Sequence, residues 1–312
     1  MKFTTIVLLL FTLVAFASNS ILCRLALLGG SVGPVEFTWM RLSAGAIALL
    51  PLVLFRKTKF GKRERQSALS AATLELQLRN LWPPLALFSY AIFFSLAYLQ
   101  LDAGTGALIL FASVQITMIG ISVCEGNKVT LVEWSGVLIS IAGLVYLLLP
   151  GLSAPPLLGT LLMILSGVSW GVYSLLGRGQ PQPILAIARN FLFTAPAVAV
   201  LGLITLGGIV LSGSARLSTD GVLLAMLSGA VTSGVGYVLW YLTVSKITTT
   251  LASVAQLAVP VLAAIGGIVF LNEAPGLRLA VASLLILGGI VLTIVGGKYA
   301  GPPAASVGEE DP

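Results

Sequence analysis

The stretch Thr248–Arg278, TTTLASVAQLAVPVLAAIGGIVFLNEAPGLR, decides the fold class of this sequence. Its apolar part reaches Leu271, which is long enough to cross a membrane as a helix, because a span needs roughly 20 apolar residues. Pro260 lies at the middle of that helix, and a polar exit, Asn272–Gly276, ends it. A second apolar segment, Leu277–Val295, follows at once, so the two segments predict a membrane-spanning hairpin.

The composition extends this prediction to the whole chain of 312 residues. Hydrophobic residues make up 57% and charged residues 9%, whereas a soluble domain has about 25% charged residues. Histidine is absent and there are two cysteines, Cys23 and Cys124. This excludes a histidine metal site, a Ser-His-Asp triad and a disulfide framework. We therefore expect a membrane protein that is not an enzyme and needs no metal and no cofactor.

Apolar segments of spanning length recur along the chain and predict an all-α integral membrane protein with ten transmembrane helices. The predicted spans are Thr4–Leu27, Pro34–Phe55, Leu81–Leu101, Thr105–Cys124, Leu131–Leu149, Leu157–Gly177, Pro183–Leu211, Val222–Ser245, Thr249–Leu271 and Leu277–Val295.

The first span also resembles a cleavable signal peptide, because a basic residue and an apolar run precede the small residues Ala15 and Ala17. The apolar run continues to Leu28, however, and Ile21–Arg24 parallels Leu175–Arg178 at the end of the sixth span. We therefore interpret the segment as the first helix.

The basic residues predict the orientation of the chain. Most of the 17 lysines and arginines fall on the side of both termini, and the loop 56–80 is the densest group. Cytoplasmic loops carry such an excess, and a polybasic loop lies against anionic headgroups. We expect a multi-pass protein of the cytoplasmic (inner) membrane with both termini cytoplasmic and a disordered tail, 298–312. Topology thus explains the net charge of +6, and no nucleic-acid partner is expected.

The two halves of the chain resemble each other. Ala91–Leu147 aligns with Tyr237–Thr293 without gaps at an offset of 146, and Arg24 and Arg41 parallel Arg178 and Arg189. We expect a first five-helix repeat at 1–150 and a second at 151–297. Since five is odd, the second repeat enters the membrane from the opposite side. Such inverted repeats are typical of alternating-access transporters, which bind substrate near the midplane between the halves.

These features resemble the drug/metabolite transporter superfamily, in particular its EamA-type branch. The resemblance rests on the two five-helix halves, an arginine in the second helix of each half, Pro260 and the exit Asn272-Glu273-x-Pro-Gly. It covers Thr4 to Val295, although Val114 stands where the pattern expects a proline in the first half. The resemblance implies export of amino acids, other metabolites or toxic cations, or movement of nucleotide-sugars.

Polar and aromatic side chains at middle depth are the candidate substrate-binding residues. Amides offer donors and acceptors without charge, as a zwitterionic ligand requires, and rings can stack on aromatic or cationic ligands. Interhelical hydrogen bonding and lipid-facing rings remain the alternative interpretation. The candidates are Asn19, Tyr90, Gln115, Trp170, Tyr173, Tyr237, Trp240 and Gln256.

Three further residues, Arg41, Arg189 and Pro260, have gating or structural roles in this interpretation. For the arginines, snorkelling to the headgroups or capping of carbonyls is favoured over anion binding. No acidic residue lies at the midplane. We therefore expect facilitated transport, or proton coupling through an end-located carboxylate such as Asp102 or Glu273.

The sequence thus predicts an exporter of small metabolites, with amino acids first and aromatic ones among them. The alternative is a flippase or carrier of lipid-linked or nucleotide-sugar substrates. The expected partners are a small-molecule substrate and membrane lipid, and the fused chain can function as a monomer.

Overall fold

The structure is a computed structural model that describes residues 3–28, 32–57, 81–101, 103–126, 129–148, 156–178, 180, 182–212, 217–271 and 277–299. Over these ranges the chain is helical and contains no strand, which confirms the all-α prediction. Three predicted features lie outside the described residues: the loop beyond residue 57, the exit Asn272–Gly276 and the tail from residue 300.

Helices occupy the segments that the sequence predicted. They are α1 (Phe3–Leu28), α2 (Pro34–Lys57), α5 (Trp82–Ala97), α6 (Ala103–Cys124), α7 (Leu131–Leu148), α8 (Leu157–Leu176), α9 (Pro183–Phe193), α10 (Ala195–Ser212), α11 (Thr219–Leu227), the π-helix η1 (Ser228–Val235), α12 (Gly236–Val244), α13 (Thr249–Ala255), α14 (Ala258–Leu271) and α15 (Leu277–Tyr299). Four described stretches are long and apolar enough to cross a membrane: Phe3–Leu27, Leu157–Leu176, Pro183–Gly208 and Thr219–Val244. The number of ten spans stays a prediction.

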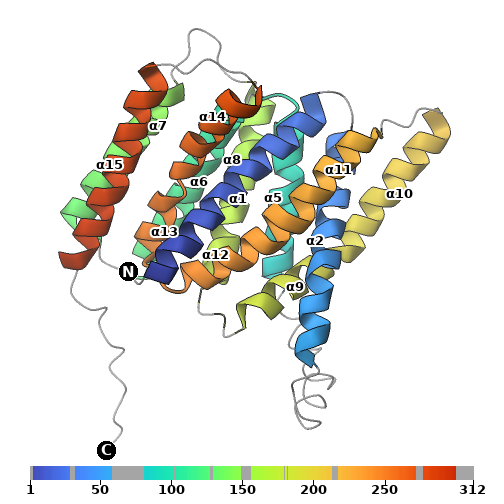
Figure 1. The fold of residues 1–312 in the computed structure, drawn as a ribbon, viewed down its shortest axis with the longest axis horizontal. Helices are drawn as coiled ribbons and strands as arrows, with labels where there is room; N and C mark the ends of the chain where they lie inside the picture. The colour runs from blue at the N-terminus through green and yellow to red at the C-terminus, as the bar shows by residue number, and fades with distance from the viewer. Residues whose placement is uncertain are drawn as a thin grey trace, which may run out of the picture.

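The helices form one bundle, in which α7 and α15 pair at one edge and α10 lies at the opposite edge (Figure 1). Helix α1 crosses the middle and packs on α11, η1, α12 and α14, while α5 packs on α8. The beginning of α1 and the end of α15 lie on the lower side of the view (Figure 1).

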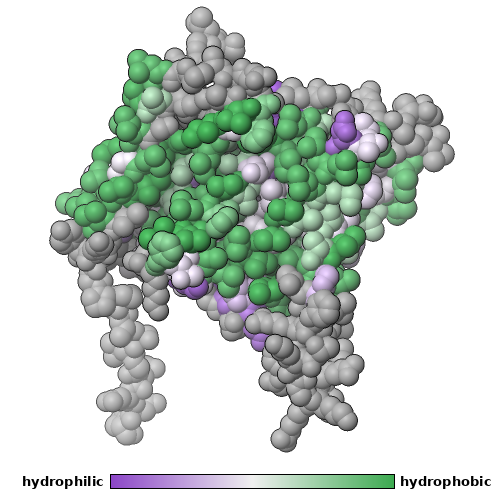
Figure 2. Space-filling model, in the orientation of Figure 1, coloured by the Kyte–Doolittle hydropathy of each residue, from purple (hydrophilic) through white to green (hydrophobic). Residues whose placement is uncertain are grey.

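The outer surface is apolar. Figure 2 shows a face dominated by hydrophobic residues, and leucines such as Leu131, Leu203 and Leu284 are 87%, 69% and 75% exposed. Soluble monomers rarely expose contiguous apolar patches larger than a few hundred Å². The surface therefore suits the hydrocarbon of a membrane.

Two of the predicted spans are broken a few residues before a proline. Pro260 has no N–H, so the carbonyl oxygen of Gln256 four residues before it loses its α-helical donor. The N–H of Val259 donates to that oxygen instead, at 3.0 Å, where α13 gives way to α14. Pro196 also follows a break, at Thr194 between α9 and α10, two residues before the proline.

Glycines allow the closest helix contacts. At the crossing of α7 and α15, a Cβ on Gly289 would overlap the hydroxyl of Ser140 and would lie 2.5 Å from the carbonyl oxygen of Gly136. Where η1 packs on α2, a Cβ on Gly229 would overlap the carbonyl oxygen of Arg41. This second approach brings the side chains of η1 against the centre of the bundle.

Candidate functional site

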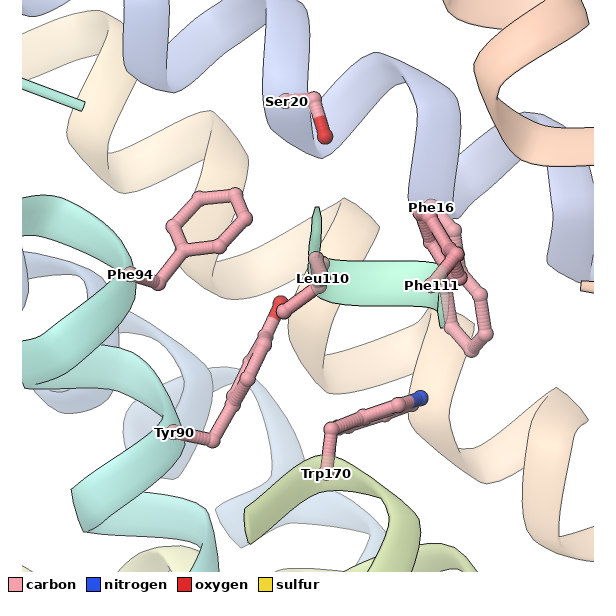
Figure 3. A pocket seen from close by; sticks show the side chains of 7 residues that line it. All are labelled: Phe16, Ser20, Tyr90, Phe94, Leu110, Phe111 and Trp170. Carbon is pink, nitrogen blue, oxygen red and sulfur yellow. The ribbon is translucent and has the colours of Figure 1, made fainter. Parts of the chain in front are cut away.

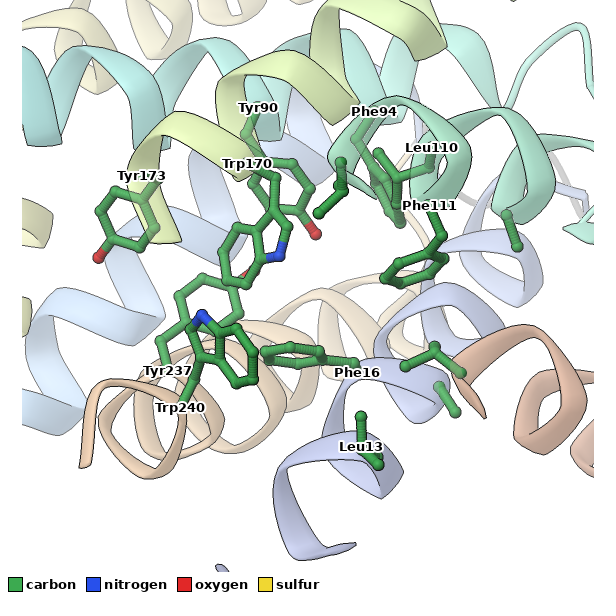
Figure 4. Close-up of a cluster of buried hydrophobic side chains, with 14 of the residues drawn as sticks. Leu13, Phe16, Tyr90, Phe94, Leu110, Phe111, Trp170, Tyr173, Tyr237 and Trp240 are labelled. Carbon is green, nitrogen blue, oxygen red and sulfur yellow. The ribbon is translucent and has the colours of Figure 1, made fainter. Parts of the chain in front are cut away.

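A cluster of buried aromatic rings fills the centre of the bundle (Figure 4). We call it the aromatic cluster, and it comprises Phe16 of α1, Tyr90 and Phe94 of α5, Trp170 and Tyr173 of α8, and Tyr237 and Trp240 of α12. The ring centroids of Trp170 lie 4.8 Å from Tyr90, 4.7 Å from Tyr237 and 5.1 Å from Phe16. The structure therefore brings all five predicted aromatic candidates together.

A small cavity lies against the cluster (Figure 3). Its lining comprises Phe16, Ser20, Tyr90, Phe94, Leu110, Phe111 and Trp170, so it lies between α1, α5, α6 and α8. It leaves about 10 Å³ for the centre of a water-sized sphere, which is room for about one water molecule. In this conformation the rings contact one another, and the cavity has no room for a larger molecule.

Arg41 of α2 lies at the cluster and is 1% exposed. Its Nε donates to the hydroxyl of Ser233 at 2.9 Å, and its Nη2 donates to the hydroxyls of Tyr90 (3.3 Å) and Tyr237. The guanidinium carbon also lies 5.3 Å from the ring centroids of Tyr90 and Phe94. Of the two structural roles expected for Arg41, snorkelling to the headgroups does not occur, because its side chain points into the bundle, and its hydrogen bonds with the described residues go to side-chain hydroxyls and not to carbonyls.

The charge of Arg41 has no acidic counterpart. Nη1 has no hydrogen-bond partner, and the described residues place no carboxylate in an ion pair with the guanidinium. The groups that contact it are neutral hydroxyls and rings. A buried charge without an opposite charge is costly and usually marks a functional site in a membrane protein.

Asn19 of α1 joins the same network. Its Nδ2 donates to the hydroxyl of Tyr90 at 3.4 Å, and its Oδ1 accepts from the hydroxyls of Ser228 and, at 3.2 Å, Thr232. Ser228 and Thr232 were not among the candidates predicted from the sequence. Both belong to η1, and π-helical turns are frequent at functional sites. The run of small and polar residues in 228–234, SGAVTSG, was the available signal.

The two glutamine candidates differ sharply. Gln256, at the break before α14, accepts from the Nε1 of Trp170 at 2.7 Å and donates to the carbonyl oxygen of Ala252 at 3.1 Å. Gln115 of α6 is 1% exposed, and neither Nε2 nor Oε1 of its amide has a partner. Phe111, one turn before Gln115, lines the cavity. Gln115 therefore offers a free donor and a free acceptor one turn from the cavity.

Within the described ranges, the other candidates make no hydrogen bond to Arg41 or Asn19. Trp240 donates from Nε1 to the hydroxyl of Ser174 at 2.9 Å, and Tyr173 accepts from the Nδ2 of Asn190 at 3.4 Å. Arg189 of α9 is half-buried, and the described part of the chain gives it no hydrogen bond or ion pair. Pro260 acts on the backbone, as the break at Gln256 shows. The structure therefore does not place Arg189 and Arg41 in equivalent surroundings.

The chain is similar to several curated proteins. The EamA-like transporter family model matches residues 157–295. An uncharacterised protein of Pseudomonas aeruginosa is 43% identical over 93% of this chain and 94% of its own length. An uncharacterised transporter of Archaeoglobus fulgidus is 28% identical over 67% of this chain and 74% of its own length. The uncharacterised transporter YoaV of Bacillus subtilis is 24% identical over 84% and 87%.

The fold also matches a solved protein. One crystal structure with 22% sequence identity covers 91% of this chain and 97% of its own chain, with a TM-score of 0.67. The apolar helices and the matching family together describe a multi-pass membrane transporter of a small molecule. The chain belongs to the EamA-like transporter family.

Proposed function

We propose that this transporter exports small metabolites, with amino acids first and aromatic ones among them, by alternating access between two inverted five-helix repeats. The repeats are 1–150 and 151–297, in a cytoplasmic (inner) membrane with both termini cytoplasmic. The observation that carries this proposal is that the helix contacts keep the same pattern when the two halves are exchanged.

The exchange pairs α1 with α8, α5 with the stretch α11–α12, α6 with α13–α14, and α7 with α15. Under this exchange, the packing of α5 on α8 corresponds to the packing of α11–α12 on α1, and the structure contains both contacts. The contact of α6 with α8 likewise corresponds to the contact of α14 with α1, and the structure contains both. The pair α7 and α15 maps onto itself. Inverted repeats related by an axis in the membrane plane produce this pattern.

Two arginines make corresponding hydrogen bonds in the two halves. Arg24 at the end of α1 donates to the carbonyl oxygen of Tyr98 at the end of α5, at 3.2 Å. Arg178 after α8 donates to the carbonyl oxygen of Ile247 after α12, at 3.0 Å. Burial lowers the pKa of the Arg178 guanidinium, and the nearby Glu125 carboxylate opposes that change. Each half thus ties the end of its first helix to the end of its third.

The chemistry of the centre supports an aromatic amino acid as substrate. Rings from α1, α5, α8 and α12 meet there, and stacked or edge-on rings are worth about 0.5–1.5 kcal/mol per pair. A substrate ring can replace these contacts when the halves separate, while the unpartnered amide of Gln115 can bind a polar group of the same molecule. The closed cavity fits an occluded state of the cycle.

The acidic residues support facilitated transport. Those in the described ranges are Glu36, Glu125, Glu133 and Asp220, and each lies near a helix end. Glu133 accepts from the N–H of Thr130 at 2.8 Å and caps α7. Asp102 and Glu273, the proposed coupling alternatives, lie outside the described residues.

The alternative of a lipid-linked or nucleotide-sugar carrier finds less support. A lipid flippase is expected to turn an arginine towards a lateral opening between helices. Arg41 is instead enclosed by α2, α5, η1 and α12 and is 1% exposed.

Counterflow in proteoliposomes tests the proposed function. Vesicles preloaded with unlabelled amino acids are given labelled tryptophan, phenylalanine, threonine or leucine, and uptake by the wild-type chain is compared with that of Trp170→Leu. Trp82→Leu is the matched control, because Trp82 is 70% exposed on the outer surface. We expect the wild type and the control to take up tryptophan and Trp170→Leu to lose uptake. Absence of uptake of every amino acid by the wild type would refute the proposed substrate class.

A further inference from the structure

Among the described residues, the groups that contact Arg41 are hydroxyls and rings, and none is a carboxylate. Ser233, Tyr90 and Tyr237 take up Nε and Nη2, so both hydrogens of Nη1 are left without a partner. The hydroxyls therefore fix the orientation of the guanidinium, and the rings of Tyr90 and Phe94, whose centroids lie 5.3 Å from its central carbon, also line the cavity. The guanidinium is therefore held in one orientation, with Nη1 available to donate and with its positive charge not neutralised.

The fold itself does not require this arrangement. At the offset of 146 that relates Ala91–Leu147 to Tyr237–Thr293, Tyr237 corresponds to Ala91, which has no polar side chain. Arg189, the counterpart of Arg41, is half-buried and makes no hydrogen bond within the described ranges. An arginine needed only for packing the repeat would have equivalent partners in both halves. The network around Arg41 is therefore specific to one half.

We propose that Arg41 is the counter-charge for a carboxylate of the transported molecule. The site then selects an organic or amino acid over an amine of the same shape. This inference rests on the proposed function, because a transported molecule must reach the aromatic cluster. When the rings of Tyr90 and Phe94 give way to the substrate ring, Nη1 donates to a carboxylate oxygen, and a charge-assisted hydrogen bond forms in a medium of low dielectric constant.

A carboxylate fits this site better than a phosphate. The hydrogen bonds and ring contacts of the aromatic cluster involve one cation, Arg41, and a phosphate monoester carries about two negative charges at neutral pH. One guanidinium neutralises a carboxylate and leaves a phosphate with excess charge. The free amide of Gln115 adds a neutral donor and acceptor, which suits the rest of an amino acid.

The first test needs no variant. The thermal stability of the purified wild-type chain is titrated with three indole ligands: tryptophan, indole-3-propionate, which lacks the amine, and tryptamine, which lacks the carboxylate. Phenylacetate and phenyl phosphate form a second pair. We expect stabilisation by tryptophan, indole-3-propionate and phenylacetate, and an apparent affinity at least about 30-fold lower for tryptamine, because the buried charge then stays unpaired. Phenyl phosphate should bind more weakly than phenylacetate.

Variants then assign the preference to Arg41. Arg41→Lys keeps the charge and should keep the preference for indole-3-propionate over tryptamine, with weaker binding, because an ammonium lacks the planar guanidinium fork. Arg41→Gln should abolish the preference. Arg189→Gln is the matched control, since it removes the arginine of the other half, and it should keep the wild-type preference. If Arg41→Gln fails to fold, Arg41→Lys and the ligand series on the wild type still decide.

Three results would overturn the proposal: tryptamine binding as well as indole-3-propionate, an unchanged preference in Arg41→Gln, or no stabilisation by any carboxylate up to its solubility limit. These outcomes are separate from the counterflow test. Tryptophan counterflow without a carboxylate preference would leave the transporter and remove the anion site. A carboxylate preference that depends on Arg41, without amino acid counterflow, would leave the anion site and remove the proposed substrate.

Discussion

Replacing Gln115 by leucine should stabilise the protein and impair transport at the same time. The side chain is 1% exposed, and both polar atoms of its amide lack a partner within the protein. A buried polar group without a hydrogen bond costs about 1–3 kcal/mol. Gln115→Leu replaces the amide with an apolar group of similar size, so we expect the free energy of unfolding to rise by about that amount.

The same substitution at Gln256 should have the opposite sign. Its Oε1 accepts from the Nε1 of Trp170 at 2.7 Å, and Trp170 is 3% exposed. Gln256→Leu leaves this indole N–H buried without an acceptor, so the free energy of unfolding should fall by about 1–3 kcal/mol. The two variants change the same chemistry at two buried sites, and they differ in whether the amide already has partners.

Reversible unfolding of both variants in mixed detergent micelles measures the two changes, and counterflow of tryptophan measures transport. We expect Gln115→Leu to be more stable than the wild type and slower in counterflow, since the substrate loses a donor and an acceptor. Destabilisation of Gln115→Leu by as much as Gln256→Leu would contradict this prediction, because it would mean that the Gln115 amide already has hydrogen-bond partners. A more stable variant with unchanged counterflow would remove Gln115 from the substrate site.

Three further substitutions test the packing and the hydrogen bonds. Gly289→Ala should lower the unfolding midpoint, because the added Cβ overlaps the facing helix, whereas a Cβ at the control Gly288→Ala meets nothing within 4 Å and should not change it. Equal effects of the two variants would contradict the close α7–α15 contact. Glu133→Ala removes the side chain that accepts from the N–H of Thr130 at 2.8 Å and should cost about 1 kcal/mol in unfolding free energy, with counterflow rate unchanged. Asn19→Leu removes the Oδ1 that accepts from the hydroxyls of Ser228 and Thr232, so the free energy of unfolding should fall by about 1–3 kcal/mol and counterflow should slow. Unchanged stability and counterflow would contradict the Asn19 network.

The apolar pattern was sufficient to place the helices, because span length and hydrophobicity are properties of a segment by itself. The breaks inside the spans were not placed. Pro260 was recognised, but the helix opens at Gln256, since a proline removes the donor for a carbonyl one turn earlier. The π-helix over 228–235 had no periodic signal in the sequence, and in the structure it lies at the close approach of η1 to α2 at Gly229.

The sequence identified the types of residue that gather at the centre of the bundle, but it did not predict the contacts between them. Depth along a helix identified Tyr90, Trp170 and Tyr237, and these rings do meet. Depth does not give the rotation of a helix about its axis. Arg41 was therefore expected to snorkel or to cap carbonyls, yet its guanidinium donates to side-chain hydroxyls inside the bundle. Such facts depend on contacts between distant segments.

Accessibility of the cavity from each side of the membrane tests alternating access at this site most directly. Ser20 lines the cavity, and Ser20→Cys in a chain with Cys23→Ala and Cys124→Ser places one thiol there. A companion chain keeps Cys124, an exposed thiol at the end of α6, as a control for sidedness. Alternating access predicts that a membrane-impermeant thiol reagent modifies Ser20→Cys from either side of oriented vesicles and more slowly with tryptophan, while Cys124 reacts from one side. Modification of Ser20→Cys from one side alone, whatever the direction of the substrate gradient, would contradict it.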